Sequence, residues 1–326
     1  MSLRVLHGLP QWRADAGIAG RRTALAIGNF DGVHRGHQAI LRRVKEYASA
    51  GGALATAVTF DPHPLKVLRP QHAPPLLSTL AQRLEWMDEF GLDAVLILPF
   101  TRELAKVSAE EFVARVLAEG LRAERVFVGD NFRFGHRHAG DVSLLESLAP
   151  RFGYAVEILA PVVAGDQVVS STSVRNAVSE GQMEEAASLL GRPFSLTGQV
   201  VSGTGRGSRE VVPTLNLAPD QELLPARGVY ATETRAAGRW YASATNVGIR
   251  PTFDGDSRVS VESHLFDFSE RYTAGPLEVR FWKRLRGEQK FASAAELKAQ
   301  ISVDMEQAKA FFRTRRELQD AGALTG

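Results

Sequence analysis

Two histidines surrounded by glycines are the first residues in this sequence whose spacing suggests chemistry. The stretch GNFDGVHRGHQAIL runs from Gly28 to Leu41 and places His34 and His37 three residues apart. Residues at this spacing share one face of a helix, so the two imidazoles are expected to point together. Imidazoles at a helix start could donate hydrogen bonds to phosphate oxygens and stabilise the charge that develops in phosphoryl or nucleotidyl transfer.

The residues around these histidines favour phosphate as the ligand. An apolar run, residues 23–27, precedes the glycines, and a helix is predicted to follow them. Glycines let the backbone turn and approach a ligand, while the N–H groups and dipole of a helix start attract an anion. A metal site would need a third ligand, for which His63 is only a loose candidate. A surface helix start with incidental histidines is the remaining alternative.

A second polar position in the first half is Asn131, in the stretch VGDNFRFG. It follows a predicted strand and is therefore expected at the carboxyl edge of a sheet. Phe132 and Phe134 flank it and could pack beside a flat ring, although ordinary core residues have the same character. Asn131 is thus a candidate for binding phosphate or a planar ligand.

The stretch SSTSVRNAV carries a third candidate site. Ser171 or Thr172 is expected to cap a helix, with Arg175 in its first turn. Hydroxyls, backbone N–H groups and a guanidinium would then converge where an anion binds. The alternative is a capped helix with a solvated arginine.

The second half has a glycine-rich loop followed by two oxygen-bearing side chains. The stretch SGTGRGSREVVPTLNL contains alternating glycines, which could fold backbone over phosphates: Gly203, Gly205 and Gly207. Thr214 and Asn216 lie two residues apart, so in an extended segment they share a face and could supply oxygen ligands to Mg²⁺. The loop is not a Walker motif, because it lacks the G-K-[ST] ending.

A carboxylate on an alternating segment is the last candidate. In RVSVESHLFDF, Glu262 is expected on one face with Ser260 and His264, opposite Val261 and Leu265. A carboxylate on the polar face of a strand can accept a proton from a substrate hydroxyl. A solvent-facing edge with no chemical role for Glu262 is the alternative.

The elements expected to position these residues differ between the two halves. In the first half strands and helices alternate, which predicts a parallel sheet with helices on both faces and ligands at the carboxyl ends of its strands. The predicted strands are 23–30, 53–60, 93–100, 124–129 and 155–163, and the predicted helices are 37–51, 80–90, 109–118 and 142–153. The helix 37–51 is expected to end at Gly51.

From about Pro193 the apolar pattern changes to a period of two. The alternating segments are 195–201, 228–235, 240–248, 258–268 and 277–286. They are separated by Gly, Pro, Asn and Asp, which predicts an antiparallel barrel or sandwich. A final helix follows, with an apolar face formed by Leu297, Ile301, Met305, Ala308 and Phe312.

Length and composition set the outer limits. A chain of 326 residues suits two domains, and the boundaries we expect are 1–181, a helical connector at 182–192, and 193–326. Lys plus Arg number 39 against 37 for Asp plus Glu, which gives little reason to expect nucleic acid or membrane partners. The absence of cysteine excludes disulfides, thiolate catalysis and Cys-based zinc sites.

No apolar run approaches the ~20 residues that span a bilayer, and the N-terminus lacks the apolar segment of a signal peptide. A cytoplasmic location is therefore expected.

The first half resembles a known family. GNFDGVHRGHQ is similar to the H-x-G-H signature of the nucleotidyltransferase superfamily, in the form found in bacterial FAD synthetase, and TFDPHP, VGDNFRFGHRHAGD and VSSTSVR match in the same order. The resemblance implies a Rossmann-like nucleotidyltransferase domain in which His34, His37 and Arg175 are catalytic. It implies ATP binding by Gly28, Asn29, Phe30, Asp31, Gly36, Ser171 and Thr172, and flavin binding by Asp61, Asn131 and Phe132.

The second half resembles the riboflavin kinase domain of the bifunctional prokaryotic riboflavin kinase/FAD synthetase. The matching pieces are GRPF, the glycine loop, PTLN, LPARGVYAT, NVGIRPTF, VESHLFDF and LEVRFWKRLR. The resemblance implies a six-stranded antiparallel barrel with a terminal helix, Mg²⁺ on Thr214 and Asn216, ATP at the glycine loop, and Glu262 as base. The commoner family loop reads G-R-x-x-G-F-P-T, whereas Ser208 and Val211 replace its Arg and second Gly here.

Together the two resemblances imply conversion of riboflavin to FMN and of FMN to FAD, each with Mg²⁺ and ATP. The implied partners are these small molecules, without nucleic acid or membrane, and a weak homo-oligomer is compatible with the sequence. One alternative is an FMN adenylyltransferase whose barrel binds flavin but has little kinase activity. Another is a non-catalytic, flavin- or nucleotide-binding regulator that contacts RNA.

Overall fold

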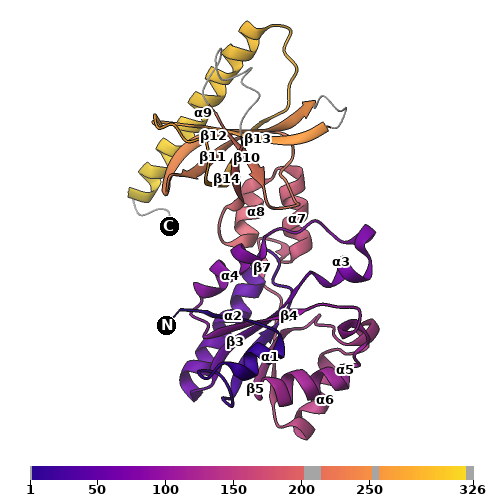
Figure 1. Ribbon diagram of the computed structural model, residues 1–326. Helices are drawn as coiled ribbons and strands as arrows, with labels where there is room; N and C mark the ends of the chain where they lie inside the picture. Colours follow the sequence, from indigo (N-terminus) through magenta and orange to yellow (C-terminus); the bar gives the residue numbers. More distant parts are fainter. Residues whose placement is uncertain (1, 202–213, 252–256, 321–326) are drawn as a thin grey trace. The chain divides into compact units, whose positions relative to one another are not determined.

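The computed structural model describes residues 2–201, 214–251 and 257–320 (Figure 1). The chain divides into two compact units, Met1–Ser171 and Thr172–Gly326. Within the described ranges, every helix is too short or too polar to cross a membrane.

The first unit is built on a six-stranded parallel sheet. Its strands lie in the order β1 (Arg4–His7), β4 (Ala94–Pro99), β3 (Leu54–Asp61), β2 (Thr23–Ile27), β5 (Ala123–Gly129) and β6 (Ala155–Leu159). Every neighbouring pair is parallel, as the alternation of strands and helices predicts. The edge strand β1 was not predicted, because four residues are too few to show a period.

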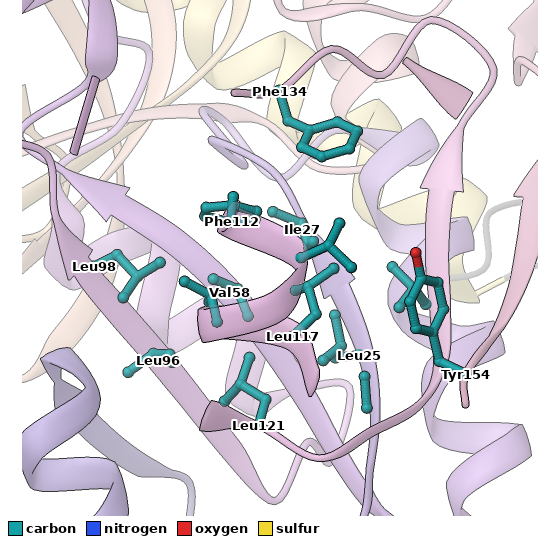
Figure 2. Close-up of a cluster of buried hydrophobic side chains, with 14 of the residues drawn as sticks. Leu25, Ile27, Val58, Leu96, Leu98, Phe112, Leu117, Leu121, Phe134 and Tyr154 are labelled. Carbon is teal, nitrogen blue, oxygen red and sulfur yellow. The ribbon is translucent and has the colours of Figure 1, made fainter. Parts of the chain in front are cut away.

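Large side chains cover one face of this sheet. Figure 2 shows strand residues such as Leu25, Val58 and Leu96 packed with Phe112 and Leu117. The helices on this face are α1 (Gly8–Ala14), α5 (Ala109–Phe112), the π-helix η3 (Val113–Gly120) and α6 (Val142–Phe152). The predicted helix 109–118 is therefore an α-helical turn followed by a π-helix.

On the opposite face of the sheet, the central strands β2 and β3 carry small side chains. Ala24, Ala26, Ala55 and Ala57 are fully buried there under α2 (Arg35–Gly51) and α4 (Leu80–Asp88). Because alanine adds little bulk, the helices can approach the sheet backbone closely. The prediction of helices on both faces is confirmed.

The helix ends follow local glycine chemistry. Gly153 has a φ of 75° and closes α6 as expected, because this left-handed conformation favours glycine. Helix α2 ends at Gly51 as predicted, and the left-handed residue that caps it is the next one, Gly52, with a φ of 73°. The shorter elements are α3 (Pro64–Leu68), η1 (Pro70–His72), η2 (Leu104–Lys106), η4 (His136–His138), β7 (Val163–Ala164) and β8 (Gln167–Val168).

The second unit is a closed antiparallel barrel with helices. Its strands follow the order β10 (Leu215–Pro219), β13 (Ser257–Leu265), β12 (Arg239–Pro251), β11 (Gly228–Ala236), β14 (Pro276–Gly287) and β9 (Phe194–Val201). The predicted six-stranded barrel is confirmed. Helices α7 (Ser171–Glu180) and α8 (Met183–Leu190) precede it in the chain, and α9 (Ala294–Asp320) follows it.

The barrel interior combines apolar packing with a chain of hydroxyl groups. Phe281 and Tyr230 are fully buried, and burial raises the pKa of Tyr230 to about 12. On strands β11, β12 and β13, hydroxyl–hydroxyl contacts of 2.6–2.9 Å form a continuous chain. Its members are, in order, Thr234, Ser243, Thr232, Thr245 and Ser263. These five buried groups satisfy one another, as buried polar atoms must.

Helix α9 packs along the barrel wall (Figure 1). Met305, Ala308 and Phe312 face the barrel as predicted and contact a cluster that includes Ala231 and Ala244. The same face also carries a charged residue, Asp304, which is 3% exposed and accepts hydrogen bonds from Arg286 of β14 at 2.8–3.1 Å. This ion pair anchors the helix and was not predicted.

Candidate active sites

The first candidate site lies where the strand order of the sheet reverses direction. From β2 the chain moves to β3 on one side and later to β5 on the other. In open parallel sheets ligands bind at such a switch point, outside the carboxyl ends of the strands. The stretch Gly28–His37 leaves the end of β2, and Asn131 follows the end of β5, so two of the predicted ligand-binding segments start at this point.

The turn between β2 and α2 has an unusual backbone. Phe30, Gly32 and Val33 have positive φ angles of 50°, 78° and 37°. A positive φ is unfavourable for any residue with a side chain and most of all for a β-branched one such as valine. Phe30 and Val33 are fully buried, so packing holds the turn in this shape.

Asp31 secures the same turn. Its carboxylate is 3% exposed and accepts hydrogen bonds from the backbone N–H groups of Leu77 and Ser78 at 3.0–3.2 Å. The Ser78 hydroxyl donates to it at 3.1 Å and accepts from the Gly32 N–H at 2.9 Å. These bonds give Asp31 a positioning role, and its predicted contact with ATP stays a prediction.

His34 and His37 stand together at the start of α2, as their spacing predicts. Their rings stack with centroids 3.7 Å apart, and Phe30 lies edge-on to His37 at 5.1 Å. His34 is the N-cap residue, and its Nδ1 accepts a hydrogen bond from the His37 backbone N–H at 3.4 Å. A Cβ at Gly36 would come within 3.2 Å of the His34 ring, so the absence of a side chain there leaves room for the imidazole.

Ser171 is tied to the histidine turn. Its hydroxyl donates a hydrogen bond to the carbonyl of Asp31 at 3.1 Å. Helix α7 begins at Ser171, so Ser171 and Thr172 lie in its first turn rather than before it, and Arg175 is its fifth residue. The expectation that one of the two caps this helix was therefore misplaced by one or two residues. The predicted phosphate contacts of Ser171, Thr172 and Arg175 stay predictions.

Asn131 and Phe132 differ in their surroundings. Asn131 is exposed just beyond the end of β5, where a ligand could reach its amide. Phe132 is partly buried and stacks on Phe134 at 5.4 Å, and Phe134 packs against Phe112. Phe134 is therefore an ordinary core residue, which was the alternative to ligand binding, whereas Phe132 is only partly in the core.

The site also contains a buried arginine, Arg83, which the sequence pattern did not indicate as a site residue. Arg83 of α4 is 3% exposed, donates a hydrogen bond from Nη1 to the carbonyl of Asn29 at 2.9 Å, and lies 3.6 Å from Asp61. Burial lowers the pKa of Arg83, an effect opposed by the charges of Asp31 and Asp61. One signal was available: Arg83 lies three residues after Leu80 and four before Met87, on the apolar face of the helix.

The second candidate site is a row of polar residues across three strands. The strand registers place Asn216 of β10 opposite Glu262 of β13, and Glu262 opposite Asn246 of β12. Directly opposite residues have Cβ atoms about 4.5–5.5 Å apart, so these side chains are neighbours on one face. We call Asn216, Glu262 and Asn246 the polar row.

The polar row lies on the outer face of the barrel. Val261, Ser263 and Leu265 alternate with Glu262 and are buried, whereas Glu262 is half-buried and Asn246 is exposed. The predicted alternation of this strand is confirmed. The sequence pattern predicts no role for Asn246, because an asparagine in an alternating segment carries no signal until the strand register is known.

Thr214 directly precedes β10 and is half-buried. The glycine loop residues Gly203, Gly205 and Gly207, and the departures Ser208 and Val211, lie outside the described residues. Threonine and asparagine oxygens beside a carboxylate suit a hard cation such as Mg²⁺. Among the described residues no group of three or more His, Asp or Glu is arranged to hold a metal.

Comparison with known protein families matches each unit to a separate model. A model described as FAD synthetase matches residues 18–173, and a model described as riboflavin kinase matches residues 190–312. The bifunctional riboflavin kinase/FMN adenylyltransferase of Pseudomonas fluorescens is 39% identical over 94% of this chain and 97% of its own length. The protein of the same name from Escherichia coli K12 is 36% identical over 95% of this chain and 97% of its own length.

The chain belongs to the bifunctional riboflavin kinase/FMN adenylyltransferase family. Members of this family carry both activities in one chain, which favours the bifunctional hypothesis over an adenylyltransferase with an inactive barrel. The relatives align across both segments, in which the FAD synthetase match precedes the riboflavin kinase match.

A solved structure supports the fold over nearly the whole chain. The crystal structure titled macrolide-efflux protein, from Streptococcus pneumoniae, is 28% identical, with a TM-score of 0.84 and coverage of 94% of this chain and 99% of its own. The activity in that title concerns that protein alone.

Proposed function

We propose that this chain makes FAD from riboflavin in two ATP-dependent steps at two separate sites. The observation that carries the proposal is the order of matches: FAD synthetase over the parallel-sheet unit and riboflavin kinase over the barrel, each with its own polar cluster. Neither step requires a covalent intermediate with the protein, because positioning and charge stabilisation suffice for phosphoryl and nucleotidyl transfer.

In the first unit, a phosphate oxygen of FMN attacks the α-phosphorus of ATP, and pyrophosphate leaves as FAD forms. The stacked His34 and His37 stabilise the developing negative charge together with the N–H groups at the start of α2. Gly28, Asn29, Phe30 and Gly36 shape the nucleotide site. The family resemblance implies that the ATP phosphates are bound by Ser171, the last residue of the first unit, and by Thr172 and Arg175 at the start of the second. Asp61, Asn131 and Phe132 contact the flavin nucleotide.

In the barrel, Glu262 accepts the proton of the riboflavin 5′-hydroxyl, and that oxygen attacks the γ-phosphorus of ATP. FMN and ADP are the products. Thr214 and Asn216 would hold Mg²⁺, which would neutralise charge on the nucleotide phosphates, and the family resemblance implies ATP binding by Gly203, Gly205 and Gly207. The half-buried position of Glu262 between two asparagines supports its role as base.

Product analysis tests the two steps separately. Riboflavin or FMN is supplied with Mg·ATP, the flavins are resolved by chromatography, and ADP and pyrophosphate are quantified. Riboflavin should yield FMN and then FAD, with one ADP for each riboflavin phosphorylated and one pyrophosphate for each FAD, and FMN should yield FAD with one pyrophosphate and no ADP. FAD from FMN without any FMN from riboflavin would contradict the kinase assignment and leave an adenylyltransferase.

Absence of turnover from both flavins, with tight FAD binding, would favour a binding regulator instead. The cytoplasmic location, the independence from nucleic acid and membrane, and a weak homo-oligomer stay part of the proposal. They are tested by fractionation and by the mass of the chain in solution.

A further inference from the structure

Arg83 is a charged residue placed where a helix packs on the sheet. It lies on the sheet-facing side of α4 with 3% of its side chain exposed. A guanidinium removed from water destabilises the fold unless charges and hydrogen bonds compensate it. A methionine or leucine would fill a similar volume without the cost of burying a charge. The contribution of Arg83 should therefore be found in the contacts that its guanidinium makes.

The guanidinium of Arg83 contacts two strand ends at once. Nη1 donates to the carbonyl of Asn29 at 2.9 Å and to the Thr59 hydroxyl at 3.4 Å, and that hydroxyl itself donates to Asn29 at 3.2 Å. Nη2 forms an ion pair with Asp61 at 3.6 Å. Asn29 belongs to the histidine turn after β2, whereas Thr59 and Asp61 belong to the end of β3.

These contacts join two segments with different predicted partners. Asn29 leads into the turn that carries His34, on the nucleotide side. Asp61 is 47% exposed and is the third residue of the TFDPHP segment, on the predicted flavin side. The Nε of Arg83 is buried and has no hydrogen-bond partner in the part of the chain that the structure describes, so the contacts of this guanidinium to the two segments are made by Nη1 and Nη2.

We propose that Arg83 is a positioning residue for adenylyl transfer, which sets the distance between the histidine turn and the Asp61 segment. The inference rests on the proposed function of the first unit. Because the FMN phosphate and the α-phosphorus must meet in line, a small displacement between these segments lowers the rate of the chemical step more than it weakens either ligand.

The test uses the full chain with Arg83→Met and Arg83→Lys, assayed for FAD formation from FMN and Mg·ATP. We expect Arg83→Met to lower kcat about 10–100-fold, with both KM values within about threefold. Arg83→Lys should give an intermediate kcat. An ammonium group keeps the positive charge, but it lacks the planar pair of nitrogens that contacts Asn29 and Asp61 at the same time. Formation of FMN from riboflavin by the same preparations serves as a control, because it shows whether the barrel is folded and active.

Arg125→Met is the matched control. Arg125 belongs to the same sheet, is 31% exposed, forms an ion pair with Glu157 at 3.3 Å and stacks on Tyr47. It lies toward the amino end of β5, away from the histidine turn. We expect this variant to lose stability but to keep kcat for FAD formation within about twofold after correction for the folded fraction.

A double-mutant cycle with Asp61→Asn adds a readout that a purely structural role would not move. If Arg83 acts through Asp61, the kcat loss of Arg83→Met should be several-fold smaller in the Asp61→Asn background than in the wild type. Fully additive losses, a wild-type kcat in Arg83→Lys, or equal losses in Arg83→Met and Arg125→Met would each overturn the inference. A wild-type chain that makes no FAD would instead refute the proposed function itself.

Discussion

The two candidate sites are positioned by different structural means. The first is assembled at loop ends: a turn with three positive φ angles, held by the buried side chains of Asp31 and Arg83, presents the stacked histidines. The second is a straight row on three adjacent strands, where backbone pairing sets the spacing of Asn216, Glu262 and Asn246. One site therefore depends on local buried contacts and the other on sheet register.

This difference predicts where each site is sensitive. Residues distant from the chemistry should matter at the first site, because its geometry is transmitted through buried side chains. At the second site, substitutions outside the polar row should matter less as long as the strands stay paired. The following variants, from the largest expected effect to the smallest, examine this contrast.

Glu262→Gln should have the largest effect, because the amide keeps the shape of the carboxylate but cannot accept the proton. We expect FMN formation from riboflavin to fall about 10²–10⁴-fold. FAD formation from FMN should stay within about twofold, and both are followed by flavin chromatography. An equal loss of both activities in folded protein would contradict the separation of the sites.

His34→Ala should produce the opposite pattern. Removal of one charge-stabilising group should lower FAD formation about 10²–10³-fold and leave FMN formation unchanged. His264→Ala is a suitable control, since His264 lies on the outer face of β13 in the barrel. Retention of FAD synthesis in His34→Ala would remove the histidine pair from the mechanism.

Gly36→Ala separates stability from activity at the first site. Alanine should favour the first turn of α2 by up to about 1 kcal/mol, yet its Cβ would lie 3.2 Å from the His34 ring and displace it. We expect an unchanged or higher melting temperature together with a roughly tenfold lower kcat for FAD formation.

The matched variant for this test is Gly51→Ala, in the last turn of the same helix, where the nearest atom to a Cβ is Glu124 Oε1 at 4.0 Å. It should change stability by a similar amount and leave FAD formation unaffected. A comparable loss of kcat in both variants would show that helix α2 as a whole, rather than the space beside His34, controls the rate.

Asn246→Ala should have the smallest effect. Its amide is exposed beside Glu262 in the polar row, so its removal should lower FMN formation about three- to tenfold, the equivalent of roughly 1 kcal/mol for one hydrogen bond. Steady-state kinetics with riboflavin and ATP measures the change. Wild-type kinetics would limit the active part of the row to Asn216 and Glu262.

Much of the architecture was predictable from residue patterns. The alternation of apolar strands with helices indicated the parallel sheet, and the period of two after Pro193 indicated the barrel. The spacing of His34 and His37 correctly predicted their juxtaposition, because an N-cap residue and the third residue of a helix are local neighbours. The segment 4–14 was missed, since a four-residue strand followed at once by Gly8 shows no measurable period.

The structural roles that the sequence did not predict share one property, because each depends on contacts between distant segments. Asp31 binds a loop 46 residues later, Arg83 reaches back 54 residues to Asn29, and Asn246 becomes relevant only through the pairing of β12 with β13. Sequence spacing carries no information on such contacts. The charged residue on the apolar side of α4 was the one local sign.

The polar row has a consequence for how this protein can change in length. Because successive side chains of a strand point to opposite faces, loss of a single residue within β13 would turn Glu262 toward the hydroxyl-lined interior and bring a neighbour such as Val261 or Ser263 outward. Insertions and deletions in the barrel should therefore be confined to its loops, whereas the strand segments that carry the row should keep a constant number of residues.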